Sequence, residues 1–228
     1  CLLCIPRGKA EDVDPEEPAR LAEASRRLGL RHVVVTSVAR DDLPDGGASQ
    51  FVKVIERLRQ TTPEATIEVL TPDFRGQEAA IRAVALAGPD IYNHNLETVA
   101  RLQRRLRPYA AYERSLHLLS SVREFSPACL TKSGIMVGLG ETEGEVVETF
   151  RDLRKARCDL LTIGQYLQSD RRNLPVVEFI RPGRFRRYEA IAYDIGFTFV
   201  AAGPFVRSSY FADHAADVLF SHRKGEKE

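Results

Sequence analysis

The sequence has few of the features that mark secreted, membrane-spanning or nucleic-acid-binding chains. Four cysteines in 228 residues are too few and too scattered for a disulfide framework. No apolar run approaches the roughly 18 residues that a transmembrane helix needs. The formal net charge is only +1, so we expect neither a nucleic acid nor a membrane as partner. These absences favour a globular protein of a reducing compartment, either the cytoplasm or, in a eukaryote, the mitochondrion.

Two of the cysteines open the sequence as Cys1-Leu2-Leu3-Cys4. Two thiolates at this spacing can bind one metal centre, but zinc sites, redox pairs and iron–sulfur clusters all use it. No methionine precedes the motif, as if the chain had been cut inside a longer one. Because two cysteines cannot complete a cluster, we expect a further ligand upstream of residue 1.

Beyond this motif, short apolar segments alternate with helical ones. Residues 32–38 are β-branched and apolar on both faces, which is typical of a buried parallel strand. Further strands are predicted at 66–70, 90–94, 131–138, 159–166 and 197–201, and helices at 15–28, 48–60, 77–87, 99–106, 112–125, 143–157 and 185–195. This order predicts an α/β fold, a partial (β/α) TIM-type barrel without its first strand and an N-terminal extension. We expect one domain over 1–228, with 202–228 as a C-terminal tail.

Polar side chains recur just after the predicted strands. They are Ser37, Asp41, Asp73, Asn95, Glu97, Glu141 and Gln165. The carboxyl ends of parallel barrel strands form one mouth, where such folds place their chemistry. We therefore expect these side chains around a single site.

One strand end has more polar side chains that could bind a ligand than the others. In Asn93-His94-Asn95-Leu96-Glu97, two amides and a carboxylate alternate along the strand, so that they point the same way and suit ribose hydroxyls. A polar strand end with a structural histidine is the alternative interpretation. Arg114, taken alone, is equally well explained as a solvated charge on a helix.

Several stretches, standing in order, resemble the lipoyl synthases of the radical S-adenosylmethionine (SAM) superfamily. The resemblance covers essentially the whole chain and rests on residues 33–47, 68–76, 93–98, 131–134, 134–142, 164–168 and 203–210. Biotin synthases share the Asn-His-Asn and Val-Gly-Leu-Gly-Glu pieces but lack the Arg207-Ser208-Ser209-Tyr210 motif. The resemblance implies a radical SAM barrel fold.

The resemblance also implies a first cluster site. Radical SAM enzymes hold a [4Fe–4S] cluster with a C-x3-C-x2-C loop, and Cys1 and Cys4 match its second and third cysteines. The open iron of that cluster binds the amino and carboxylate groups of SAM. In the same way, Asn95 and Glu97 correspond to ribose contacts and Arg114 to a fork donor on the SAM carboxylate.

Three further positions complete the predicted SAM-binding set. Gly138 lies in the stretch that packs along adenine in these families, where glycines let the backbone approach the ring. Ser37 and Gln165 are the strand-end residues that we add to this set.

A second cluster is implied at the other end of the chain. In lipoyl synthases the second serine of Arg-Ser-Ser-Tyr is the fourth ligand of an auxiliary [4Fe–4S] cluster, and Ser209 matches it. A serine alkoxide is a harder and more labile iron ligand than a thiolate, which suits a cluster that surrenders its sulfides. Its three cysteine partners belong to an N-terminal extension. Cys129 and Cys158 fit neither cluster, so we expect them to be structural.

The implied activity is sulfur transfer by radical chemistry. SAM is cleaved to methionine and a 5′-deoxyadenosyl radical, which removes hydrogen from C6 and C8 of an octanoyl chain on a carrier lysine. The implied partners are the octanoylated lipoyl domains of 2-oxoacid dehydrogenase E2 or glycine cleavage H protein, with ferredoxin or flavodoxin as reductant. We expect the chain to be inactive without its upstream cluster ligands.

Two other interpretations stay open. One is a non-catalytic barrel that binds octanoylated or lipoylated carrier domains, because the chain alone completes neither cluster. The other is a radical SAM sulfur inserter of the biotin synthase kind, against which the Ser209 motif argues.

Overall fold

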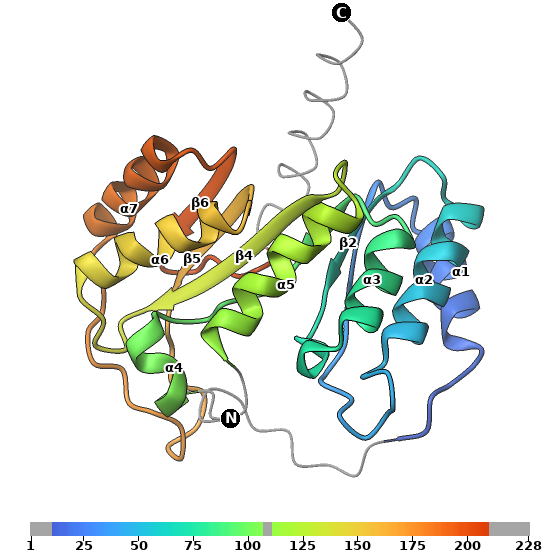
Figure 1. Cartoon of the computed structure of the whole chain (residues 1–228), viewed down its shortest axis with the longest axis horizontal. Coiled ribbons are helices and arrows are strands. Elements are labelled where there is room, and N and C mark those ends of the chain that lie inside the picture. Colours follow the sequence, from blue (N-terminus) through green and yellow to red (C-terminus); the bar gives the residue numbers. More distant parts are fainter. Residues whose placement is uncertain (1–10, 107–110, 210–228) are drawn as a thin grey trace, which may run out of the picture. The chain divides into compact units, whose positions relative to one another are not determined.

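The structure, a computed structural model, describes residues 11–106 and 111–209, which belong to two compact units. The N-terminal unit contains residues 11–93 and 121–131, and the C-terminal unit contains residues 94–106, 111–120 and 132–209. The N-terminal unit pairs its three parallel strands in chain order, and the C-terminal unit does the same with the other three (elements labelled in Figure 1). None of the helices described in these ranges is long and apolar enough to cross a membrane.

The N-terminal unit is built from parallel strands covered by helices. Its elements are α1 (Glu17–Arg27), β1 (His32–Thr36), α2 (Ala48–Thr61), β2 (Thr66–Leu70), the 3₁₀-helix η1 (Phe74–Gly76), α3 (Glu78–Leu86) and β3 (Ile91–Asn93). The central helix, α2, buries Phe51, Val54, Ile55 and Leu58, whose spacing puts them in one apolar stripe on a single face of the helix. It packs against both α1 and α3. The stripe explains why this stretch is helical and which side of it faces the core.

The C-terminal unit repeats the same layering. It contains α4 (Ala100–Leu106), α6 (Glu143–Lys155), β5 (Leu160–Gln165), α7 (Pro182–Ile195) and β6 (Phe199–Gly203), and the larger parts of α5 (Tyr112–Phe125) and β4 (Leu130–Val137). In its core, the Phe150 ring of α6 meets Tyr188 and Phe197 edge-on, with centroids 6.3 Å apart in both pairs. These contacts hold α6 and α7 together beside the sheet.

The strand register creates a face of small residues in this unit. Gly134 of β4 pairs with Thr162 of β5, and Met136 pairs with Gly164. Gly164 in turn pairs with Gly203 of β6. Paired residues of parallel strands point to the same side of the sheet. Apart from Met136, the residues of this face are small, which leaves room for other segments to cross it.

Element boundaries differ from the sequence predictions by two or three residues in several places, and three of these differences have a physical reason. The last strand runs from Phe199 to Gly203, two residues later than predicted, because Phe197 packs on Phe150 and caps α7 instead. Helix α7 begins at Pro182, three residues earlier, since proline is favoured in the first turn. Helix α6 ends at Lys155, before Arg157 takes a positive φ of 61°.

Candidate functional site

The segment after β3 is held firmly along β4. The His94 amide donates to the Lys132 carbonyl at 3.0 Å, and the Glu97 amide donates to the Gly134 carbonyl at 2.9 Å. The Met136 amide donates to the Glu97 carbonyl at 2.9 Å, which closes a parallel bridge. Glu97 has a φ of +72°, an uncommon conformation for a residue with a side chain. The backbone therefore sets the position of Glu97 from both sides.

Asn95 lies over the small-residue face. A Cβ atom built on Gly134 would stand 2.8 Å from Asn95 Oδ1 and 2.7 Å from Thr162 Oγ1, closer than real side chains approach. Asn95 is half-buried, so its amide is partly shielded from water. Gly134 is thus a glycine because the Asn95 side chain needs the space above β4.

Arg114 is placed by a buried contact of the residue that follows it. The His94 Nε2 atom lies 2.9 Å from the Ser115 Oγ atom, and both residues are buried. This hydrogen bond ties α5 to the segment that carries Asn95. Arg114 itself is half-buried on α5. His94 has the structural role that the alternative interpretation gave it.

The turn after β4 is closed by a carboxylate. The Glu141 side chain accepts from the Gly138 amide at 2.5 Å and from the Leu139 amide at 2.9 Å. Both oxygens are therefore used by the main chain of the turn. The predicted mouth residue Glu141 shapes the end of β4.

An ion pair between Arg101 and Glu145 stabilises the same turn. Arg101 Nη2 donates to the Gly140 carbonyl at 2.8 Å, and the Arg101 guanidinium binds both Glu145 oxygens, at 2.6 and 3.0 Å. Glu145 also completes the capping box of α6 with Thr142. These hydrogen bonds, that of Arg101 first, lower the pKa of Glu145 to about 2.

Gln165, at the end of β5, holds the loop that leads to α7. Its side chain is buried, its Nε2 atom donates to the Glu178 and Tyr166 carbonyls at 3.0 Å, and its Oε1 atom accepts from the Ile180 amide at 2.8 Å. Both amide protons are thus engaged with main chain. We call this arrangement, with Gly138 described next, the Gln165 latch.

Gly138 forms the other side of the Gln165 latch. Its carbonyl accepts from the Val177 amide at 2.9 Å and from the Glu178 amide at 3.3 Å. Its φ is +99°, and a Cβ atom there would overlap Gln165 Nε2 and the Glu178 carbonyl oxygen. The position requires glycine because the loop packs directly on it.

The segment after β6 crosses β5. A Cβ atom on Gly164 would overlap the Val206 carbonyl oxygen and stand 3.2 Å from Arg207 Nη1. Arg207 Nη1 also donates to the Val206 carbonyl at 2.7 Å. Ser209 follows two residues later with its side chain exposed. The predicted cluster ligand therefore stands just beyond a segment fixed on the small-residue face.

The remaining predicted residues lie elsewhere. Ser37 belongs to the N-terminal unit, where its exposed hydroxyl donates to the Val38 carbonyl at 3.0 Å. Cys1 and Cys4 lie outside the described residues. Cys129 and Cys158 are buried thiols, and burial raises the pKa of Cys158. Within 11–106 and 111–209, no group of three His, Cys, Asp or Glu side chains could hold a metal ion.

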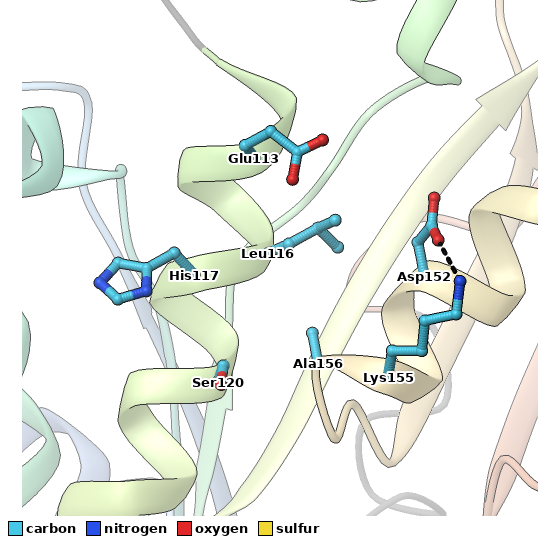
Figure 2. Close-up of a pocket in the computed structure, with 7 residues that line it drawn as sticks. All are labelled: Glu113, Leu116, His117, Ser120, Asp152, Lys155 and Ala156. Carbon is cyan, nitrogen blue, oxygen red and sulfur yellow. Dashed lines mark hydrogen bonds and ion pairs between the residues drawn. The ribbon is translucent and has the colours of Figure 1, made fainter.

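A cavity of about 370 Å³ opens between α5 and α6 (Figure 2). It is lined by Glu113, Leu116, His117, Ser120, Asp152, Lys155 and Ala156. Asp152 already binds Lys155 Nζ at 3.1 Å and accepts from the Tyr112 hydroxyl at 3.1 Å. In Figure 2 Leu116 points toward α6, whereas the His117 ring points away from it. This cavity therefore holds no converging set of ligand-binding groups.

The structure thus brings four predicted SAM residues together along β4. Asn95 and Glu97 lie beside the strand, Gly138 ends it, and Gln165 packs on Gly138. The sequence interpretation missed the 177–180 loop that packs on the same glycine. No periodic sequence pattern marks that loop. The only sequence signal for it is a glycine after one strand, Gly138, together with an amide side chain at the end of the next strand, Gln165.

Comparison with known structures agrees with this architecture. The chain is similar to Streptococcus suis SuiB bound to S-adenosylmethionine, with a TM-score of 0.66 at 12% identity over 89% of this chain and 47% of that chain. It is also similar to HydG, a maturase of the [FeFe]-hydrogenase, with a TM-score of 0.63 at 14% identity over 92% and 53% of the two chains. The predicted α/β fold of the partial-barrel radical SAM kind is confirmed.

Sequence comparison identifies the family. Residues 1–153 match the model of the radical SAM superfamily. The lipoyl synthase of Caldanaerobacter subterraneus subsp. tengcongensis is 59% identical over 93% of this chain and 75% of the relative. Those of Rubrobacter xylanophilus and Alkaliphilus metalliredigens are 50% and 48% identical, over 99% and 98% of this chain and 70% and 77% of the relatives. The chain belongs to the lipoyl synthase family of the radical SAM superfamily.

Proposed function

We propose that the C-terminal unit binds SAM along β4 and presents an octanoyl group to it for sulfur insertion at C6 and C8. Family membership makes the chain a radical SAM sulfurtransferase that uses SAM and [4Fe–4S] clusters and acts on lipoyl carrier proteins with a reductant. The observation that carries the placement is the fixed 94–97 segment on β4, which sets Asn95 and Glu97 beside each other.

Three side chains suit the polar parts of SAM. The Asn95 amide and the Glu97 carboxylate offer a donor and acceptors for ribose hydroxyls. Arg114 offers a planar fork for the carboxylate. All three are half-buried and are carried by segments fixed through main-chain or buried contacts, so little ordering is needed on binding.

When bound, the cluster and SAM together supply the radical that breaks unactivated C–H bonds, which no side-chain base can do. The chain contributes orientation and exclusion of water. Gly138 and Gln165 serve this purpose through the Gln165 latch, which fixes a loop at the end of β4. The role of Ser37, which belongs to the N-terminal unit, stays a prediction from the sequence.

We assign the cluster ligands from the family motifs. Cys1 and Cys4 hold the SAM-binding cluster, and Ser209 holds the auxiliary one. The side chain of Ser209 is exposed, so it is accessible to a cluster whose other ligands come from other segments. Serine oxygen is a harder ligand than thiolate, which suits a cluster that gives up sulfide.

The finer partners follow from the substrate class. The carriers are octanoylated lipoyl domains of 2-oxoacid dehydrogenase E2 or the glycine cleavage H protein, and ferredoxin or flavodoxin supplies electrons. We place the protein in the cytoplasm, or in the mitochondrion of a eukaryote, because its few and scattered cysteines suit a reducing compartment.

Anaerobic reconstitution tests the function. This chain is joined to the part of the Caldanaerobacter relative that it does not match, and is loaded with iron and sulfide. About eight irons per chain, SAM cleavage and conversion of an octanoyl-lysine peptide to lipoyl-lysine are expected, because two four-iron clusters are required. Carrier binding without SAM cleavage would instead favour the non-catalytic alternative.

Ser209→Ala separates the two clusters. The variant retains SAM cleavage, since Ser209 does not contact SAM in this proposal, but loses most sulfur insertion. Thr198→Ala, outside both predicted cluster motifs, is the matched control and leaves both readouts near those of the parent. An unchanged lipoyl yield in Ser209→Ala would remove the role assigned to this serine.

A further inference from the structure

Most of the exposed large apolar side chains described for the C-terminal unit lie in the segments that follow β5 and β6 in the chain, and Tyr193 on α7 is the exception. Among the residues described for this unit, four large apolar side chains that water can reach follow the carboxyl ends of β5 and β6. They are Leu167 at 43%, Val177 at 65%, Phe179 at 70% and Phe205 at 79% exposure. Such side chains are usually scattered singly over a surface. Here they share the strand ends at which barrels of this kind carry out their chemistry.

Phe179 is exposed on a rigid backbone. The residues on either side of it are pinned to Gln165, Glu178 through its carbonyl and Ile180 through its amide. Two residues earlier, the Val177 amide is bonded to the Gly138 carbonyl. The Gln165 latch therefore fixes the main chain that carries both apolar residues just after β4.

No uncompensated charge lies between the two apolar side chains. Glu178 stands between Val177 and Phe179 in the chain, but its carboxylate binds Arg184 Nη1 at 2.9 and 3.0 Å. An apolar ligand can therefore reach both side chains without desolvating a lone carboxylate.

We propose that Val177 and Phe179 bind the octanoyl chain of the substrate, and that Gln165 is the positioning residue that holds them beside the SAM site. This inference rests on the proposed function, which supplies an eight-carbon saturated chain as the ligand. Such a chain has no polar atom beyond its amide and is recognised only by apolar contact. The 177–180 loop is hydrogen-bonded to Gly138, directly after the strand β4 along which SAM is proposed to bind. An octanoyl chain bound to this loop therefore has its carbons near the cofactor.

Binding of a fluorescent N6-octanoyl-lysine peptide to the 228-residue chain tests the proposal by anisotropy. Phe179→Ala is expected to weaken binding about tenfold, because a large apolar contact is lost. The control is Leu28→Ala, which removes an equally exposed side chain (72%) from the other unit and leaves the affinity unchanged. Equal affinities of Phe179→Ala and parent overturn the proposal, as does failure of the parent to prefer the octanoyl over the unacylated peptide.

Chain length gives a second readout that a purely structural role would not move. Shortening the acyl chain from octanoyl to hexanoyl removes two methylenes and weakens binding to the parent about tenfold. In Phe179→Ala the same shortening matters less than threefold, because the contacting ring is gone. A length preference that survives the substitution contradicts the assignment.

Gln165→Ala tests the positioning role. If Gln165 acts only through the loop, Gln165→Ala and Phe179→Ala each weaken binding of the octanoyl peptide. The double variant then binds the peptide as tightly as the single variant with the lower affinity. Additive losses would mean that Gln165 acts elsewhere. Should Gln165→Ala fail to fold, the exposed Phe179 and Val177 variants still decide the proposal.

Turnover separates this inference from the function on which it rests. In the reconstituted enzyme, Phe179→Ala is expected to raise KM for the octanoyl peptide with little change in kcat. Turnover by the parent with an unchanged KM in the variant overturns the inference alone. Absence of lipoyl formation by the parent overturns the function.

Discussion

Replacing Gly138 by alanine tests whether the Gln165 latch, rather than backbone conformation alone, demands glycine. Gly138 and Gly140 have nearly equal positive φ values, +99° and +96°. A Cβ atom at Gly138 overlaps Gln165 Nε2 and the Glu178 carbonyl, whereas at Gly140 the nearest atom, of Val177, is an ordinary 3.7 Å away. Gly140→Ala therefore carries the backbone strain without the overlap.

The magnitudes follow from this difference. Backbone strain costs each variant about 1–2 kcal/mol of unfolding free energy. Gly138→Ala also displaces the amide of Gln165, and the loss of two hydrogen bonds adds about 2–3 kcal/mol. In a chain of this size, 1 kcal/mol shifts Tm by about 2–4 °C, so we expect drops near 4 °C for Gly140→Ala and near 10 °C for Gly138→Ala.

Thermal unfolding followed by circular dichroism measures both variants. In a Gln165→Ala background the additional penalty of Gly138→Ala should be smaller, because the overlap with the Gln165 amide is absent and only the overlap with the Glu178 carbonyl remains. Equal Tm values for the two glycine variants, or an undiminished penalty in the Gln165→Ala background, would refute the reasoning.

Two further predictions concern ionisable groups. The pKa of Glu145 is lowered from 4.5 to about 2, chiefly by Arg101. The ionised Glu145 side chain therefore contributes fully to the free energy of unfolding above pH 4.5, and this contribution is lost as pH falls toward 2. In Glu145→Gln, the urea midpoint should fall less steeply between pH 5 and pH 3 than in the parent, and parallel curves would contradict this. Burial raises the pKa of Cys158, so this thiol should resist iodoacetamide at pH 8 in the folded chain and react after unfolding, as peptide mass spectrometry would show. Rapid labelling of the folded chain would contradict the burial of Cys158.

Local signals in the sequence predicted most of the fold. The β-branched runs mark strands because both of their faces are buried, as in β2. The helix start at residue 143 was predicted, and the structure adds a capping box of Thr142 and Glu145 there. The shift of β6 was not predictable, because Phe197 suits a strand and a core contact equally well.

Side-chain roles at the strand ends were harder to predict. Asn95, Glu141 and Gln165 look alike in sequence, as polar residues after apolar strands. In the structure Glu141 closes a turn and Gln165 pins a loop, and both do so through main-chain groups. Main-chain partners carry no residue-specific mark, so a sequence pattern does not reveal which polar side chains are already engaged.

Glycines in β4 and β5, and Gly138 directly after β4, show where such contacts occur. Each of three positions without a Cβ atom lies beneath a segment that bears a predicted site residue: Asn95 over Gly134, Gln165 over Gly138, and Arg207 over Gly164. A glycine in a strand weakens it, so it persists where something must approach the backbone. These crossings hold the Asn95 amide, the loop with Phe179 and the segment leading to Ser209 on one unit. The glycines thus mark where the proposed cofactor and substrate contacts are fixed, before any ligand is considered.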